Sequence, residues 1–142
     1  MKVAKALKRK IRWSFGVLFT SGLAYWMTRL FLRKPGLFGG EAPHPIERAL
    51  GPLHLAAALF FLFVLGIVWA QHATVSIRAG KQRPSGWGFY AAITLLALSG
   101  ITMLYGNDAL IHRAEQLHPW FGVCLLPVLV FHWTRARRQT YN

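Results

Sequence analysis

Long apolar runs separated by clusters of basic residues constrain the fold of this chain more than any other feature. A run of about 20 apolar residues is long enough to cross the hydrocarbon core of a bilayer as a helix. Only about 15 strictly apolar residues follow His118, so the last run must extend into the basic residues behind it or be helped by a bend at His118, where Pro119 disfavours a helix. We therefore predict an all-α fold, an integral membrane four-helix bundle that forms one domain over residues 1–142. The helices are expected at about 13–33, 53–72, 87–105 and 118–135, with a short amphipathic surface helix at about 109–117.

The charge of the chain does not indicate nucleic acid, although the formal net charge is +13 over 142 residues. The chain is 54% hydrophobic, and its lysines and arginines gather between the apolar runs, so the pattern favours a membrane protein. The N-terminus has a basic segment followed by an apolar run, which is the order of segments in a signal peptide. We predict a retained helix because the run is long enough to span and no cleavage motif follows it.

The distribution of basic residues predicts the topology. Six lysines and arginines precede the first run, three lie in the 73–86 loop and three in the C-terminal tail, which makes twelve on one side against five on the other. The positive-inside rule then places both termini in the cytoplasm, and the predicted location is the inner (cytoplasmic) membrane of the cell. All four acidic residues fall on the outer side.

Four histidines mark the ends of the second and fourth predicted spans, namely His54, His72, His118 and His132. The fourteen residues from His118 to His132 turn a helix by about 1400°, and the eighteen from His54 to His72 by about 1800°, so each pair shares a face. The predicted topology places His54 at the depth of His118, and His72 at the depth of His132. Two facing helices then offer two imidazoles for each of two haem irons. The second helix has about 6 Å more rise between its histidines, which a difference in tilt would have to absorb.

Other metal sites fit the sequence less well. No Asp or Glu lies within a predicted span, which counts against a di-iron carboxylate bundle and against a proton-coupled transporter. Cys124 is the only cysteine, so there is no thiolate site and no Cys-x-x-Cys-His motif for covalent haem, and we expect Cys124 to be a small buried hydrophobe.

Several further residues are candidates for contacts with a cofactor. Arginines near the span ends are suited to haem propionates or, equally, to lipid headgroups; they are Arg48 and Arg113 outside, and Arg78 and Arg135 inside. Small residues suit either helix contacts or a close approach of porphyrin; they are Gly66, Gly100 and Gly122. His44 and His112 are expected at the outer surface, with a quinone or partner contact as the second interpretation.

The run Leu98-Ser-Gly-Ile-Thr-Met-Leu-Tyr-Gly106, a loop, and then His118-x13-His132 with basic residues behind it resemble the last two helices of bacterial di-haem b-type cytochromes. That family includes the membrane subunits of formate dehydrogenase and hydrogenase. The likeness covers about residues 50–138. The chain differs because its first helix has no histidine, so its plan of two histidines on each of two helices is closer to the cytochrome b of quinol–cytochrome c oxidoreductases.

These observations predict a di-haem cytochrome b subunit of a respiratory chain, with two b haems held by the four histidines. Such a subunit would carry electrons across the bilayer between a quinone pool and a redox partner, such as a cytochrome or an iron–sulfur protein. It would have no catalytic domain of its own, and its quinone site is left open. The alternative is a haem-free accessory subunit that packs against a larger membrane complex.

Overall fold

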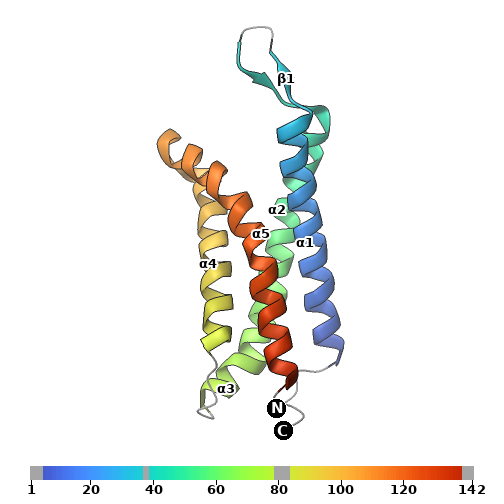
Figure 1. Cartoon of the computed structure of the whole chain (residues 1–142), viewed down its shortest axis with the longest axis vertical. Coiled ribbons are helices and arrows are strands. Elements are labelled where there is room, and N and C mark those ends of the chain that lie inside the picture. The colour runs from blue at the N-terminus through green and yellow to red at the C-terminus, as the bar shows by residue number, and fades with distance from the viewer. Residues whose placement is uncertain (1–4, 37–38, 79–83, 139–142) are drawn as a thin grey trace. The chain divides into compact units, whose positions relative to one another are not determined.

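The structure, a computed structural model, describes residues 5–36, 39–78 and 84–138, and in those ranges the all-α prediction is confirmed. The chain divides into two compact units, Met1–Lys81 and Gln82–Asn142, and each is built on a helical hairpin (Figure 1). In chain order the elements are α1 (Lys5–Phe31), β1 (Lys34–Pro35), β2 (Glu41–Ala42), α2 (Pro45–Val68), the π-helix η1 (Trp69–Ala73), α3 (Thr74–Arg78), α4 (Pro84–Tyr105) and α5 (Asp108–Arg138).

In the first hairpin, α1 packs against α2 along a line of small residues. Buried positions on α1 recur every seven residues at Leu7, Ser14, Ser21 and Thr28, the spacing that keeps one face of a helix toward a neighbour. Each of the three hydroxyls bonds the carbonyl three residues earlier on its own helix, so the short polar side chains are satisfied. Small side chains on this line let the two backbones approach closely, as helix pairs in membranes do.

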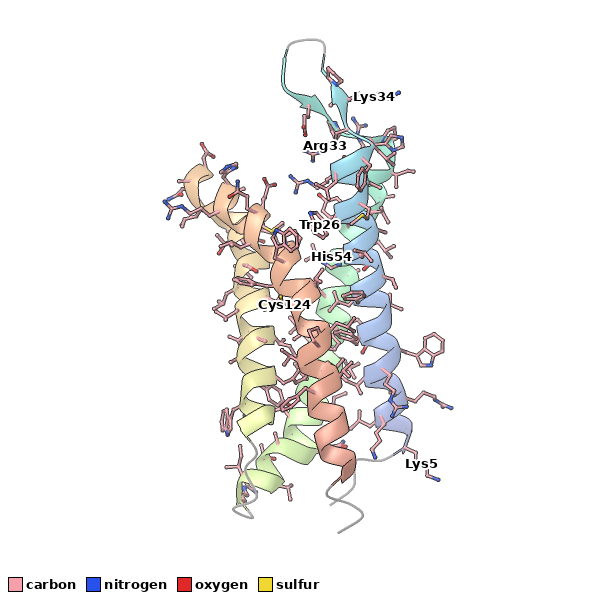
Figure 2. The ribbon with its side chains drawn as sticks, in the orientation of Figure 1. Lys5, Trp26, Arg33, Lys34, His54 and Cys124 are labelled. Carbon is pink, nitrogen blue, oxygen red and sulfur yellow. The ribbon has the colours of Figure 1, made fainter. Side chains whose placement is uncertain are left out.

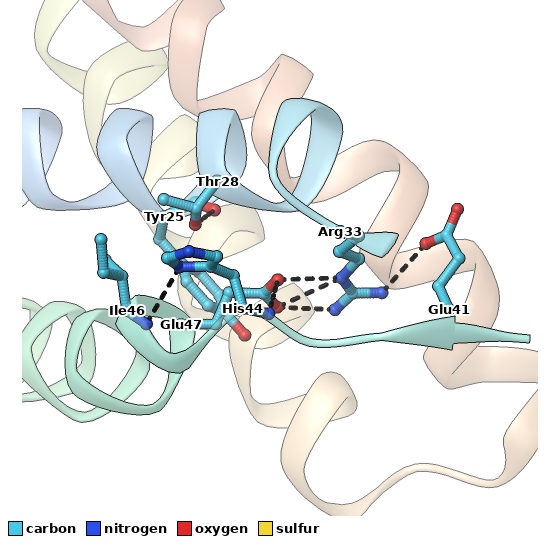
Figure 3. Close-up of polar contacts among 7 residues, drawn as sticks. All are labelled: Tyr25, Thr28, Arg33, Glu41, His44, Ile46 and Glu47. Atoms are coloured by element: carbon cyan, nitrogen blue, oxygen red, sulfur yellow. Dashed lines mark hydrogen bonds and ion pairs between the residues drawn. The ribbon is translucent and has the colours of Figure 1, made fainter. Parts of the chain in front are cut away.

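A short antiparallel ladder between β1 and β2 joins the two helices, and α2 begins immediately after it. His44 caps α2, since its Nδ1 accepts from the backbone N–H of Ile46 while the Glu47 carboxylate accepts from the backbone N–H of His44 (Figure 3). Pro45 occupies the first helical position, where its missing N–H costs nothing. The helix therefore starts eight residues before the predicted position 53, and Pro52 lies within it.

Arg33 ties the ladder to the start of α2 (Figure 3). Its Nε and Nη2 donate to both oxygens of Glu47 at 2.8–3.2 Å, and Nη1 reaches Glu41 at 3.5 Å. Hydrogen bonding to Glu47 raises the pKa of the Arg33 guanidinium above its ordinary value, because it favours the charged form. Arg33 therefore keeps its positive charge at any physiological pH. Glu47 is 6% exposed, which makes this the buried end of the network.

The second hairpin consists of α4 and α5, whose contact is lined by Phe89, Ile93, Ala114, Leu125 and Leu129. The connection between them is a turn with a cap, in which the Asn107 side chain accepts from the N–H of Leu110.

The predicted surface helix at 109–117 and the fourth predicted span are one continuous helix in the structure, so the separation expected at His118 is wrong. Pro119 and Pro127 both lie inside α5. Figure 1 shows the first part of α5 running obliquely away from the end of α4 before the helix turns to run beside it. Proline removes one backbone bond without ending a membrane helix, because neighbouring groups compensate.

Within the described residues, three helical segments are long and apolar enough to cross a membrane, namely Pro45–Gln71, Gly86–Tyr105 and Asp108–Phe131. Large apolar side chains on these segments are exposed, such as Leu59 at 61% and Phe63 at 66%. Such a surface suits lipid and not water. The chain is therefore a multi-pass membrane protein. Within the described residues α1, the first predicted span, is not among these segments, since serine, threonine and glycine residues and Arg29 interrupt its apolar residues.

Candidate functional site: two histidines held by serines

His54 lies between α1 and α2, toward the end of the hairpin that carries the β ladder (Figure 2). Its Nδ1 is 3.2 Å from the hydroxyl oxygen of Ser21 on α1. The neighbouring residue, Gly22, faces the edge of the ring: a Cβ at that position would be 2.6 Å from His54 Cε1. A hydroxyl and a bare backbone on α1 thus define where the imidazole of α2 can lie.

His118 has the same arrangement in the second hairpin. Its Nδ1 is 2.7 Å from the hydroxyl oxygen of Ser99 on α4, and Gly100, the next residue, would place a Cβ 3.7 Å from His118 Cε1. In both hairpins the histidine is on the second helix, and a Ser-Gly pair on the first helix receives it. The distance along the sequence differs, since His54 follows Ser21 by 33 residues and His118 follows Ser99 by 19.

Both histidines are half-buried, and each is fixed through one ring nitrogen. Metal-ligating histidines in proteins are usually held in this way, because the hydrogen bond at one nitrogen sets the ring orientation and the tautomer for the other. The partner in the structure is a serine of the neighbouring helix.

The other two predicted ligands are placed only by their backbones, because their side chains lie outside the described residues. His72 falls in η1, where the N–H of Thr74 bonds the carbonyl of Trp69 five residues earlier. A π-helical turn rotates less per residue than an α-helix. The count of five whole turns from His54 to His72 therefore does not hold. His132 lies on the same helix as His118, as the prediction required, and both are on α5.

The predicted pairing of His54 with His118, and of His72 with His132, joins one hairpin to the other. It stays a prediction. Within the described residues, no group of three or more histidine, cysteine or carboxylate side chains gathers in a way that could hold a metal ion.

Three of the four predicted propionate-binding arginines have described side chains, and all three are exposed; they are Arg48, Arg78 and Arg113. Helical geometry puts Arg48 about 120° around the helix from His54, and Arg113 about 140° around from His118. Neither lies on the face of its histidine. The side chain of Arg135 is outside the described residues, and the propionate role stays a prediction for all four.

The remaining candidates have simpler surroundings. Cys124 is exposed on α5, so the expected buried position is wrong (Figure 2). The next residue, Leu125, is buried. Gly66 and Gly122 meet nothing within 4 Å of an added Cβ, unlike Gly100.

His44 and His112 behave as surface groups in the structure. His44 is the helix cap described above, and His112 is exposed with its Nε2 3.1 Å from Gln116 Nε2. Neither observation bears on a quinone.

Ser21, Gly22 and Ser99 were missed by the sequence reasoning, which considered Gly100 only as a helix contact or a porphyrin contact. A usable signal was present, because the dipeptide Ser-Gly stands in the C-terminal half of both helices that carry no histidine. Comparisons of the chain with protein-family models, with curated proteins and with solved structures found no match.

Proposed function

We propose that this chain is a small membrane cytochrome that binds b-type haem through four histidines of α2, η1 and α5 and passes electrons between a quinone pool and a redox partner protein. His54, His72, His118 and His132 are the proposed axial ligands, paired across the helices by depth. The observation that carries the proposal is the repeated arrangement of histidine, serine and glycine in the two hairpins. One such polar contact would help two helices to pair in lipid, but the same contact in both hairpins suits a common role in holding the imidazole rings.

The residues present fit a haem iron. Imidazole is the commonest biological ligand of haem, and neutral imidazole needs no counter-charge in lipid. Ser21 and Ser99 supply the second contact that an axial histidine requires for a defined ring orientation. With two histidines on each iron, bound haem supplies one-electron transfer and leaves no coordination position for oxygen.

We also propose that α1 is the fourth span and that both termini are cytoplasmic. Support comes from its packing against α2, which is itself long and apolar enough to cross (Figure 1). The charges of α1 lie near its ends, between Lys5 and Arg12 and at Arg29, where long side chains can reach the headgroups.

An absorption spectrum of the purified full chain tests the proposal directly. Cells that make the chain with ample haem should yield a protein with the reduced bands of low-spin b haem and two haems per chain. Acidified acetone should release these haems intact, because Cys124 is not in a motif that attaches haem. A chain purified without haem under these conditions would instead be the accessory subunit of a larger complex.

Histidine variants test the ligand pairs. His54→Ala and His118→Ala should lose the same haem and show matching spectra, and His72→Ala and His132→Ala should lose the other. His112→Ala is the matched control, since this histidine is exposed on α5, and it should keep both haems. If His54→Ala matches His132→Ala, the pairing by depth is wrong. If His72→Ala keeps both haems, the inner iron has another ligand.

A further inference from the structure

The hydroxyl of Ser21 has one proton, and the structure indicates where that proton goes. The Ser21 hydroxyl oxygen is 3.0 Å from the carbonyl of Leu18, and the Ser99 hydroxyl oxygen is 2.9 Å from the carbonyl of Leu96. A carbonyl oxygen only accepts hydrogen bonds, so each serine is the donor in that contact. The hydroxyl then has only lone pairs to offer to anything else.

The same hydroxyl oxygens contact Nδ1 of His54 and of His118. Because each serine has already given its proton to a carbonyl, the ring nitrogen must be the donor.

We infer that Ser21 and Ser99 are positioning residues that keep the ring proton of His54 and His118 on Nδ1, so that the lone pair lies on Nε2 and is directed away from the serine. Gly22 completes this arrangement in the first hairpin because it leaves room for the ring edge, whereas a Cβ at Gly100 would make only an ordinary contact with His118 at 3.7 Å. The inference deepens the proposed function and rests on it for the identity of the metal, since Nε2 is then the atom that ligates haem iron. The tautomer itself can be measured without any haem.

The test uses the full chain with ¹⁵N-labelled histidine, purified in detergent from cells that cannot make haem, at a pH where the rings are neutral. Ring ¹⁵N chemical shifts distinguish a protonated from an unprotonated nitrogen. His54→Gln and His118→Gln identify the two sets of signals by their disappearance. Both rings should be in the Nδ1–H form.

Serine variants then test the cause. Ser21→Ala should shift the tautomer ratio of His54 toward Nε2–H by roughly fivefold, the equivalent of one ordinary hydrogen bond, and leave His118 unchanged. Ser99→Ala should do the reverse. Ser14→Ala is the matched control, because Ser14 is also a buried serine of α1 bonded to a carbonyl three residues earlier. It should change neither ring.

Threonine variants guard against a general loss of structure. Ser21→Thr keeps the hydroxyl and should restore the Nδ1–H form of His54, even if Ser21→Ala unfolds the hairpin. An Nε2–H ring in the unmodified chain, or a ratio that Ser21→Ala does not change, overturns the inference. Nδ1–H rings in a chain that binds no haem even when haem is supplied would support the inference and refute the proposed function. Failure of the inference can thus be distinguished from failure of the proposed function.

In the haem-loaded chain, the same variants should change a spectroscopic signature. Ser21→Ala and Ser99→Ala should retain haem. Each variant should lower the haem affinity, or shift the midpoint potential, of the haem whose axial histidine has lost its serine partner. Ser14→Ala should leave both properties unchanged. Equal potentials in all three variants would count against the positioning role.

Discussion

Replacement of Gly22 by alanine should displace the imidazole of His54. The added Cβ would lie 2.6 Å from Cε1, 3.1 Å from Nδ1 and 3.3 Å from Nε2, while ordinary contact begins at 3.4 Å. The ring must therefore move about 0.8 Å away from α1, as the difference between 3.4 and 2.6 Å requires. Ser21 is the adjacent residue, and its bond to Nδ1 is already 3.2 Å long. The same movement stretches that bond beyond a useful hydrogen-bond length.

The free energies oppose one another. Alanine in place of a helical glycine normally stabilises by about 0.5–1 kcal/mol. Overpacking against a fixed neighbour costs about 1–3 kcal/mol, and the lost hydrogen bond costs about 1 kcal/mol more. Gly22→Ala should therefore destabilise the hairpin by about 1–3 kcal/mol in all. Gly16→Ala, on the same helix with nothing within 4 Å of the added Cβ, should stabilise it by up to about 1 kcal/mol.

Heat unfolding in detergent, followed by the helical circular dichroism, compares the three glycine variants. The midpoint should fall for Gly22→Ala and rise for Gly16→Ala. Gly100→Ala should be nearly neutral, since its Cβ would be 3.7 Å from His118, an ordinary contact. The ¹⁵N signals of His54 should change only in Gly22→Ala. A Gly22→Ala chain that is as stable as Gly16→Ala and has unaltered His54 signals would refute the packing of this ring against α1.

Two further predictions concern the outer end of the first hairpin and the topology. Glu47→Ala should lower the free energy of unfolding by about 1–3 kcal/mol, because it removes the buried carboxylate, whose side chain is 5% exposed, that pairs with Arg33 and caps α2. Glu41→Ala should cost less than about 0.5 kcal/mol, because the Glu41 side chain is 68% exposed. The same heat-unfolding measurement decides, and equal losses would mean that burial of the pair contributes nothing. Reporter fusions after Gly40 and after Asn107 should both signal the outer side, and a cytoplasmic signal from either would exclude the proposed topology.

The sequence predicted the helices better than their ends. The apolar runs behind α2, α4 and α5 are long, so the bilayer length rule found them. The sequence prediction began the second helix at 53 and missed the start of α2 at Pro45, because the residues before 53 are rich in glycine and proline and read as a loop. The capping residues His44 and Glu47, with Pro45 between them, are the local signal that starts a helix there. The continuity of α5 was missed because Pro119 disfavours a helix only statistically, and the chain accommodates it.

The candidate site was predicted in part. The histidines at the span ends were found from spacing, since helical periodicity relates residues on one helix. Their serine partners were not, because periodicity says nothing about which residue of another helix lies opposite. The π-helical turn at η1 was not foreseeable either, because nothing in the apolar pattern marks one extra residue in a turn.

The repetition of the site is the strongest argument for a function. A single bond between His54 and Ser21 has an adequate explanation as a polar contact that helps two helices to pair in a membrane. The second hairpin has a different loop and a different core, yet it sets His118 against Ser99 with the same ring nitrogen, and a glycine again follows the serine. Packing alone does not require the same three residue types in both places. A function common to both hairpins would explain the repetition. A ring held by Nδ1 suits a metal ligand, because such a ligand must present Nε2 in one orientation.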